Sequence, residues 1–219
     1  MLKALRRWLD ARPAHDAGRW VVLDVESSGL DPRRDRLLAI AAIALQHTEG
    51  AAPRIVLGDS FEVVLRQGDE SLAHADKANI LLHGIGVGAQ RDGMAPDAAL
   101  EAFERFVGTS PLIAFHAAFD RAMIERACDL LRRPRLPNPW LDLEPISAVL
   151  YPEVRARALD EWMAHFGIEC AVRHQAAADT LATAELLLKL WPAVRKQVRS
   201  PGFAALVDLA AQRRWMAAN

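Results

Sequence analysis

The segment Trp20–Val25 is apolar on both faces, and two acids, Asp24 and Glu26, come where this run ends. Such a segment predicts a central strand that is covered on each side. Side chains alternate along a strand, so Asp24 and Glu26 point to the same face. Two carboxylates this close repel each other unless a cation lies between them or solvent separates them. The pair therefore indicates a metal site, although the same spacing also marks ordinary strands that enter a turn.

A third acid, Asp120, follows a second predicted strand. Pro111–Phe115 has the apolar character of a strand, and Ala118–Leu131 carries apolar residues at helical spacing. Asp120 falls in the first turn of that helix, where the helix dipole stabilises any acid. Taken alone, Asp120 is therefore interpreted as a helix-end residue.

A histidine and a fourth acid accompany a helix expected from about Ala176 to about Leu190. His174 lies in the preceding loop and Asp179 in the first turns. Positions five apart on one helix diverge by roughly 140°, so the two side chains converge only if His174 is off the helix. An unperturbed histidine titrates near ~6.5 and can accept a proton at physiological pH. The pair suits a general base beside a metal ligand.

The order of the remaining elements predicts the fold class. Three strands followed by alternating helices and strands predict an α/β fold with a mixed sheet flanked by helices. An apolar stripe in Met1–Pro13 indicates a short docked helix, with a transit peptide or a membrane-surface helix as alternatives. The connection Arg66–Pro96 shows little periodicity and is expected to be a long loop, either functional or disordered. Its H-G-I piece favours a position on the substrate side. The other expected strands are Arg36–Leu45, Ser60–Leu65 and Trp140–Leu143. The other expected helices are Asp97–Val107, Ala158–Phe166 and Phe203–Trp215. Asp142 is expected to cap a further helix that follows the last strand.

Together the motifs resemble those of the DEDDh 3′→5′ exonucleases, the family of the proofreading epsilon subunit of bacterial DNA polymerase III. LDVESSGLDP resembles the family's D-x-E-T-T-G-L-D-P segment, and LLHGIG resembles its H-G-I-T loop. IAFHAAFD resembles the H-N-x-x-F-D segment, and RHQAAADTLATAELL resembles the H-x-A-x-x-D-A-x-x-T segment. The resemblance extends from Trp20 to about Leu190. It implies a ribonuclease H-like fold with a mixed five-stranded sheet in one exonuclease domain over residues 1–219, with a core of about 18–195 and helical extensions at both ends.

The resemblance also implies a role for each motif residue. Asp24 would bridge two Mg²⁺ or Mn²⁺ ions about 4 Å apart, a spacing typical of two-metal sites. Glu26 and Asp179 would complete the coordination of one ion, and Asp120 would bind the other partly through water. His174 would deprotonate the attacking water. The residues expected to contact substrate are Ser27, Ser28, Gly29, Leu30, His83, His116 and Phe119.

Two positions depart from the family pattern. Ala117 stands where the family usually has Asn, and Gly86 where it usually has Thr, so rate or substrate preference differs from the family's if those positions contact substrate. A sister subfamily uses Tyr in place of the histidine, but the one tyrosine of this chain, Tyr151, lies elsewhere.

Charge and cysteine content limit the kinds of nucleic acid, cellular compartment and metal site that suit this chain. With 27 basic and 28 acidic residues the net charge is −1, which argues against a processive duplex binder. The two cysteines, Cys128 and Cys170, suit a reducing cytoplasm, and no apolar run reaches the ~18 residues of a membrane span. A zinc site built from His165, Cys170 and His174 has irregular spacing and is disfavoured.

The predicted function is a 3′→5′ exonuclease that releases nucleoside 5′-monophosphates from single-stranded 3′ ends, with DNA as the expected substrate. Two alternatives remain: an exoribonuclease on short RNA, and a non-catalytic module that binds a polymerase or nucleic acid. The sequence leaves open whether the protein assembles with a polymerase or with copies of itself.

Overall fold

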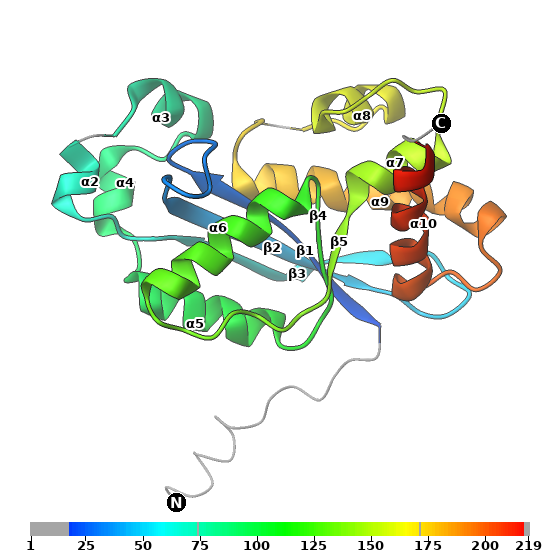
Figure 1. Cartoon of the computed structure of the whole chain (residues 1–219), viewed down its shortest axis with the longest axis horizontal. Helices are drawn as coiled ribbons and strands as arrows, with labels where there is room; N and C mark the ends of the chain where they lie inside the picture. The colour runs from blue at the N-terminus through cyan, green and yellow to red at the C-terminus, as the bar shows by residue number, and fades with distance from the viewer. Residues whose placement is uncertain (1–17, 74, 171, 217–219) are drawn as a thin grey trace, which may run out of the picture.

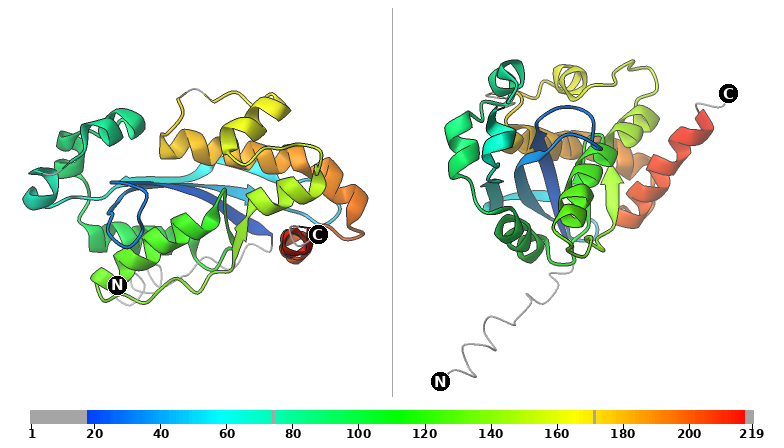
Figure 2. Two further views of the ribbon diagram at one scale, coloured as in Figure 1. Left: turned by 45° about the horizontal axis from the view of Figure 1, so that its top comes forward. Right: turned by 60° about the vertical axis from the view of Figure 1, so that its left-hand side comes forward.

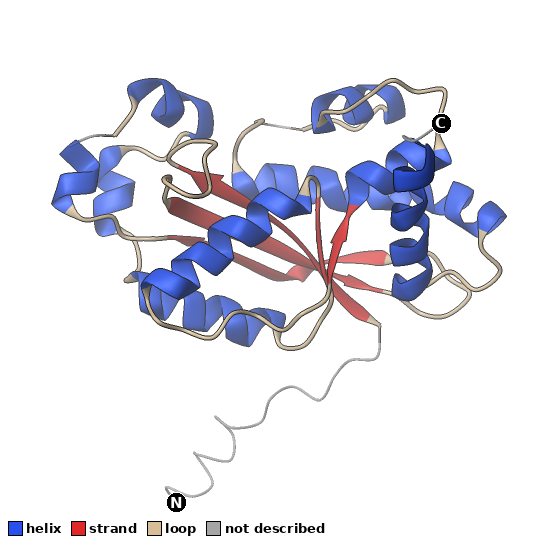
Figure 3. Cartoon of the chain, viewed as in Figure 1, coloured by secondary structure: helices blue, strands red, loops and turns tan. Residues whose placement is uncertain are grey.

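The computed structural model describes residues 18–73, 75–170 and 172–216, and the helix expected at Met1–Pro13 lies outside them. Its centre is a five-stranded sheet in the order β3-β2-β1-β4-β5 (Figures 1 and 3). β1 pairs antiparallel with β2 and parallel with β4, so the predicted mixed sheet is confirmed. The strands are β1 (Arg19–Ser27), β2 (Leu37–Gln46), β3 (Arg54–Val64), β4 (Leu112–Ala114) and β5 (Trp140–Asp142).

Helices cover both faces of the sheet, with α9 above it and α5 and α6 below it in the left view of Figure 2. Val22 and Ile113 belong to one core cluster with residues of α7, α8, α9 and α10, whereas Val21 and Leu112 belong to a second cluster with residues of α5 and α6. This alternation explains why β1 is apolar on both faces. The helices are α2 (Asp69–Ala73), α3 (Lys77–His83), α4 (Val87–Asp92), α5 (Pro96–Val107), α6 (Ala117–Leu130), α7 (Leu143–Leu150), α8 (Leu159–Phe166), α9 (Ala176–Gln197) and α10 (Phe203–Met216).

Two predicted boundaries are wrong. β3 begins at Arg54 instead of Ser60, and its pairing with β2 shifts register between Ile43 and Ala44, an irregularity that breaks the alternating pattern of a regular strand. α9 does not end at Leu190 but continues through Pro192 to Gln197. Trp191 and Val194 are buried in the first core cluster, so their packing outweighs the cost of the helix hydrogen bond that Pro192 cannot donate.

The connection between β3 and α5 is folded, contrary to the expected loop. It contains α2, α3 and α4, each too short to show helical periodicity in the sequence. Asp76 accepts a hydrogen bond from the amide of Ala78 at the start of α3, and Gly84 ends that helix with φ 73°. These caps fix the two ends of α3, whose last residue, His83, begins the H-G-I segment. No helix in the described ranges is long and apolar enough to cross a membrane.

Candidate metal centre

Three carboxylates from two distant segments converge at one end of the sheet. Asp24 and Glu26 project from β1, Asp179 projects from the first turn of α9, and their ligand oxygens lie within 4.8 Å of one another. Asp24 and Glu26 share the face of β1 that carries Trp20 and Val22, which pack in the core cluster that includes α9. The start of α9 is fixed to the sheet, because the Thr180 hydroxyl donates to the Ala41 carbonyl of β2 at 3.2 Å. The predicted grouping of the two motifs is therefore present.

Asp120 reaches the same strand from α6. Its side chain is buried, and Oδ1 accepts a hydrogen bond of 3.1 Å from the backbone amide of Val25, the residue between Asp24 and Glu26. β4 ends at Ala114, so the edge of β1 beyond that point has no partner strand and the Asp120 carboxylate takes the amide. Asp120 is therefore not a solvent-facing helix-end residue. Its bond to the residue between Asp24 and Glu26 places the Asp120 carboxylate beside the cluster.

The pKa values of Asp24, Glu26 and Asp120 are raised, chiefly by burial. Burial raises the pKa of Asp24 well above its usual range, and the charges of Asp120, Glu26 and Asp179 add to this. Burial and the charge of Asp179 raise the pKa of Glu26 to about 8. Burial raises the pKa of Asp120 to about 7, although the amides of Asp120 itself and of Val25 oppose the rise. A divalent cation would reverse these shifts, and carboxylate oxygens are the donors that Mg²⁺ and Mn²⁺ prefer.

His174 lies off the helix, as predicted, with a left-handed φ of 60°. Its backbone amide donates to Oδ2 of Asp179 at 3.1 Å, which ties the loop to the cluster. His174 is only half-buried. Cys170 Sγ lies 3.9 Å from Oδ1 of Asp179. Among the described residues, His165, Cys170 and His174 form no metal-ligand group, so the acidic cluster is the candidate metal centre.

The loop between β1 and β2 is held in place by its own polar side chains. The Ser27 hydroxyl donates to the carbonyl of Gly29 at 2.6 Å, and the Ser28 hydroxyl donates to Asp35 at 3.1 Å. A Cβ at Gly29 would lie 2.5 Å from Oδ2 of Asp35, so a larger residue there would displace the carboxylate that Ser28 contacts. Leu30 is 88% exposed at the loop's tip, which leaves its side chain available to a ligand.

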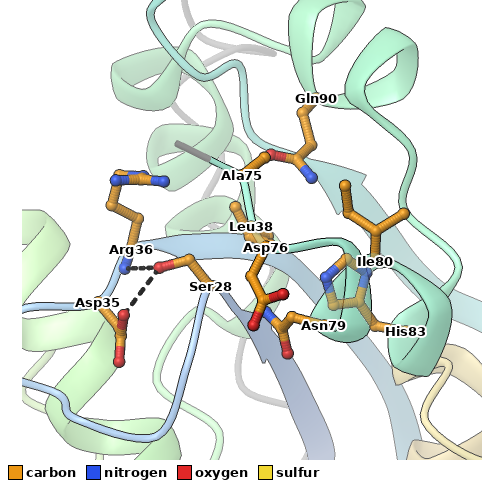
Figure 4. Close-up of a pocket in the computed structure, with 10 residues that line it drawn as sticks. All are labelled: Ser28, Asp35, Arg36, Leu38, Ala75, Asp76, Asn79, Ile80, His83 and Gln90. Carbon is orange, nitrogen blue, oxygen red and sulfur yellow. Dashed lines mark hydrogen bonds between the residues drawn. The ribbon is translucent and has the colours of Figure 1, made fainter. Parts of the chain in front are cut away.

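His83 lies behind this loop rather than on the surface. It is 3% exposed and lines a cavity of about 120 Å³ with Ser28, Arg36, Asn79 and other residues of the loop and of the α2–α4 segment (Figure 4). The amide of Ile85 donates to Nδ1 of His83, so Nε2 carries the proton of the neutral ring, and that atom has no hydrogen-bond partner. Asn79 donates to the carbonyl of Ser27 at 2.7 Å and so fixes α3 against the end of β1.

The remaining predicted contacts, His116 and Phe119, lie at the start of α6. His116 is exposed with a φ of 60°, and its amide donates to Oδ1 of Asp142 at 2.9 Å. Phe119 is half-buried against the second core cluster. Asp142 also accepts from the amide of Glu144, which confirms it as the cap of α7.

Sequence patterns did not reveal several contacts that shape the site. Arg173 forms ion pairs with Asp179 and with Asp160, and Asn79 and Asp35 fix the β1–β2 loop. The only signal for Arg173 is its place next to His174. The others come together through tertiary contacts between segments far apart in sequence.

Two comparisons with known sequences agree with the motifs. The RNase T family model, described as exonuclease, matches residues 21–187. The DNA polymerase III subunit epsilon-like protein of Rhodobacter capsulatus is 30% identical over 200 residues, and the PolC-type DNA polymerase III of Bacillus subtilis is 29% identical over 174 residues. The matches cover 90% and 78% of this chain but only 27% and 11% of those relatives.

Solved structures of exonuclease I share the fold. One has a TM-score of 0.68 at 19% identity and is matched over 80% of this chain and 41% of its own. E. coli exonuclease I in complex with a dT13 oligonucleotide has a TM-score of 0.69 at 18% identity, over 82% of this chain and 42% of its own. At these identities the likeness establishes the architecture alone. The expected ribonuclease H-like fold is confirmed.

Proposed function

The chain belongs to the RNase T family of exonucleases, and on this premise we propose that it is a metal-dependent enzyme that removes nucleoside 5′-monophosphates from single-stranded 3′ ends of DNA. The observation that carries the proposal is the convergence of Asp24, Glu26 and Asp179 within 4.8 Å. Like-charged groups at this spacing, with the pKa values of Asp24 and Glu26 raised by burial and by neighbouring carboxylates, suit a site whose stable form contains cations.

The donor set fits two hard divalent ions. Asp24, Glu26 and Asp179 would hold one ion, and Asp24 with Asp120 would hold the second, Asp120 partly through water. Bound Mg²⁺ or Mn²⁺ would supply Lewis-acid stabilisation of the phosphodiester and would lower the pKa of a bound water. The fixed backbone contacts of Asp120 and Asp179 keep their carboxylates oriented for this task.

His174 is the proposed general base. It would accept the proton of the attacking water at an imidazole nitrogen and release it to solvent from its half-exposed position. The amide of His174 is already bonded to Asp179, so the residue is tethered to the cluster while its ring stays able to turn towards the water.

The β1–β2 loop and α3 are the proposed seat of the terminal nucleotide. Leu30 and Leu81 are 88% and 85% exposed, and the contact between Asn79 and Ser27 holds their two segments together. Exposed apolar side chains provide surfaces against which a base can pack without sequence preference. A paired end must first fray to reach the carboxylates, so single strands are the preferred substrate. Exonuclease I has been solved with single-stranded oligonucleotides, in keeping with this choice.

We further propose that the protein acts in the cytoplasm, where its two thiols remain reduced, and that its partner is a 3′ end rather than long duplex DNA. An exoribonuclease and a non-catalytic binding module are the competing functions. The complete set of four acids with His174 favours an enzyme over a module. The name of the Rhodobacter relative and the PolC-type relatives favour DNA over RNA.

One gel assay separates these functions. Single-stranded DNA, blunt duplex DNA and a short RNA, each labelled at the 5′ end, are incubated with the protein and Mg²⁺, Mn²⁺ or a chelator. The proposal predicts a ladder of shortened single-stranded DNA that the chelator abolishes, with slower degradation of the duplex. Faster loss of RNA would establish the exoribonuclease, and intact strands under every condition would establish a binding module.

A further inference from the structure

Arg173 connects the candidate metal centre to a neighbouring helix. Its Nη1 donates to Oδ1 of Asp179, and its Nε donates to Oδ1 of Asp160 on α8. The Arg173 side chain is 25% exposed and that of Asp179 is 8% exposed, whereas that of Asp160 is 57% exposed. The guanidinium therefore has one buried partner within the cluster and one open partner outside it.

The charge of Arg173 acts on the two acids of β1. It lowers the pKa of Asp24 and of Glu26, opposing the burial and carboxylate repulsion that raise them. The two ion pairs raise the pKa of Arg173 itself, so the guanidinium stays charged. In the protein without bound ions, Arg173 thus supplies part of the positive charge that the clustered acids require.

This arrangement conflicts with metal binding at Asp179. Oδ1 of Asp179 accepts from Arg173 and Oδ2 accepts from the amide of His174, so both oxygens of this expected ligand already have donors. A divalent ion on the same carboxylate repels the positively charged guanidinium and competes with it for the carboxylate oxygens. Asp160 offers Arg173 a second partner that lies outside the three-carboxylate group.

We propose that Arg173 is a resident counter-ion that occupies Asp179 in the metal-free protein, competes with the divalent ion, and withdraws onto Asp160 when the ion binds. The inference rests on the proposed metal site and assigns to that site a built-in competitor. Arg173 acts through Asp179 and is a positioning residue, not a catalytic one. It keeps the empty cluster folded and sets the ion concentration at which the site fills.

The test is calorimetric titration of MnCl₂ into the full chain at pH 7.5, with wild type, Arg173→Gln, Arg173→Lys and Arg121→Gln. Arg173→Gln removes the competitor and is expected to bind Mn²⁺ about tenfold more tightly, since a hydrogen bond to a charged group has roughly that effect on an equilibrium constant. Arg173→Lys keeps the charge and is expected to stay close to wild type. Arg121→Gln is the matched control, because Arg121 follows Asp120 in the chain but pairs with Glu125 outside the cluster.

Thermal unfolding supplies a second readout that needs no activity. In chelator, Arg173→Gln is expected to melt below wild type, and saturating Mn²⁺ should reduce that difference. Equal or weaker Mn²⁺ binding by Arg173→Gln, or equal tightening in Arg121→Gln, overturns the counter-ion role while leaving the metal site intact. If neither wild type nor any variant binds Mn²⁺, the proposed function and this inference both fail.

Discussion

The metal-free protein should lose stability as pH rises through the neutral range, and Glu26→Gln should remove part of that loss. The pKa of Glu26 is raised from 4.5 to about 8 by burial and by Asp179. Between these values the folded protein binds a proton that the unfolded chain has released. The free energy of unfolding therefore falls with pH in this window, and the stabilisation present below pH 4.5 is fully lost once pH exceeds about 8.

The magnitude follows from the size of the rise. One pKa unit corresponds to about 1.4 kcal/mol, so ionising Glu26 in the folded, metal-free protein costs at most about 5 kcal/mol. Such a cost is comparable to the total stability of many domains. Asp24 and Asp120, whose pKa values are also raised, interact with Glu26, so the measurable gain from Glu26→Gln at pH 8.5 is smaller, on the order of 1–3 kcal/mol.

Urea unfolding in chelator from pH 5.5 to 8.5 measures this effect, with the exposed Glu153→Gln as control. Burial lowers the pKa of His47 and His83, which also changes stability in this range, but both histidines are present in every variant and cancel in the comparison. Glu26→Gln should diverge from wild type as pH rises, whereas Glu153→Gln should run parallel to it. A Glu26→Gln curve parallel to wild type across the range would refute the assigned burial and repulsion.

Four further substitutions and one salt series test the site. Asp24→Asn and Asp120→Asn should each abolish hydrolysis while the circular dichroism spectrum stays native, and near-normal activity in both would rule out the two-metal assignment. His174→Ala should lower kcat by about 10²-fold and remove the neutral limb of the pH–rate profile; an unchanged profile would point to another base. Gly29→Ala should raise KM more than it lowers kcat, because the new methyl group meets Asp35; an unchanged KM would show that the loop does not seat substrate. A salt series should give a weak dependence of KM, about −0.7 in logarithmic slope per phosphate contacted, and a circular strand should stay uncut; a steep slope or cutting of the circle would indicate an extended or endonucleolytic site.

The central part of the fold was predictable because local patterns and tertiary packing agree there. Trp20–Val25 is apolar on both faces because α9 covers one and α5 and α6 cover the other. The period of two in a strand was enough to place Asp24 and Glu26 on one face, and the loop position of His174 followed from the geometry of α9. Both predictions are confirmed by the structure.

Other features depend on contacts that no local pattern encodes. α2, α3 and α4 have too few turns for periodicity, and α9 passes Pro192 because buried neighbours hold it. Asp120 has the sequence position of a helix-end residue. Its bond to the amide of Val25 forms because β4 ends at Ala114 and leaves that amide without a partner strand. The catalytic and substrate roles of these residues, and the extent of the domain, stay predictions.

The most direct test of the central claim follows both ends of one strand. A single-stranded oligonucleotide carrying one label on its 3′-terminal nucleotide and another at its 5′ end is incubated with wild type or Asp24→Asn in Mg²⁺. A metal-dependent 3′→5′ exonuclease built on this cluster releases the 3′ label first, as a nucleoside 5′-monophosphate, while the 5′ label moves down a ladder one nucleotide at a time, and Asp24→Asn releases neither. Early release of the 5′ label, internal fragments, or equal release by Asp24→Asn would contradict the account.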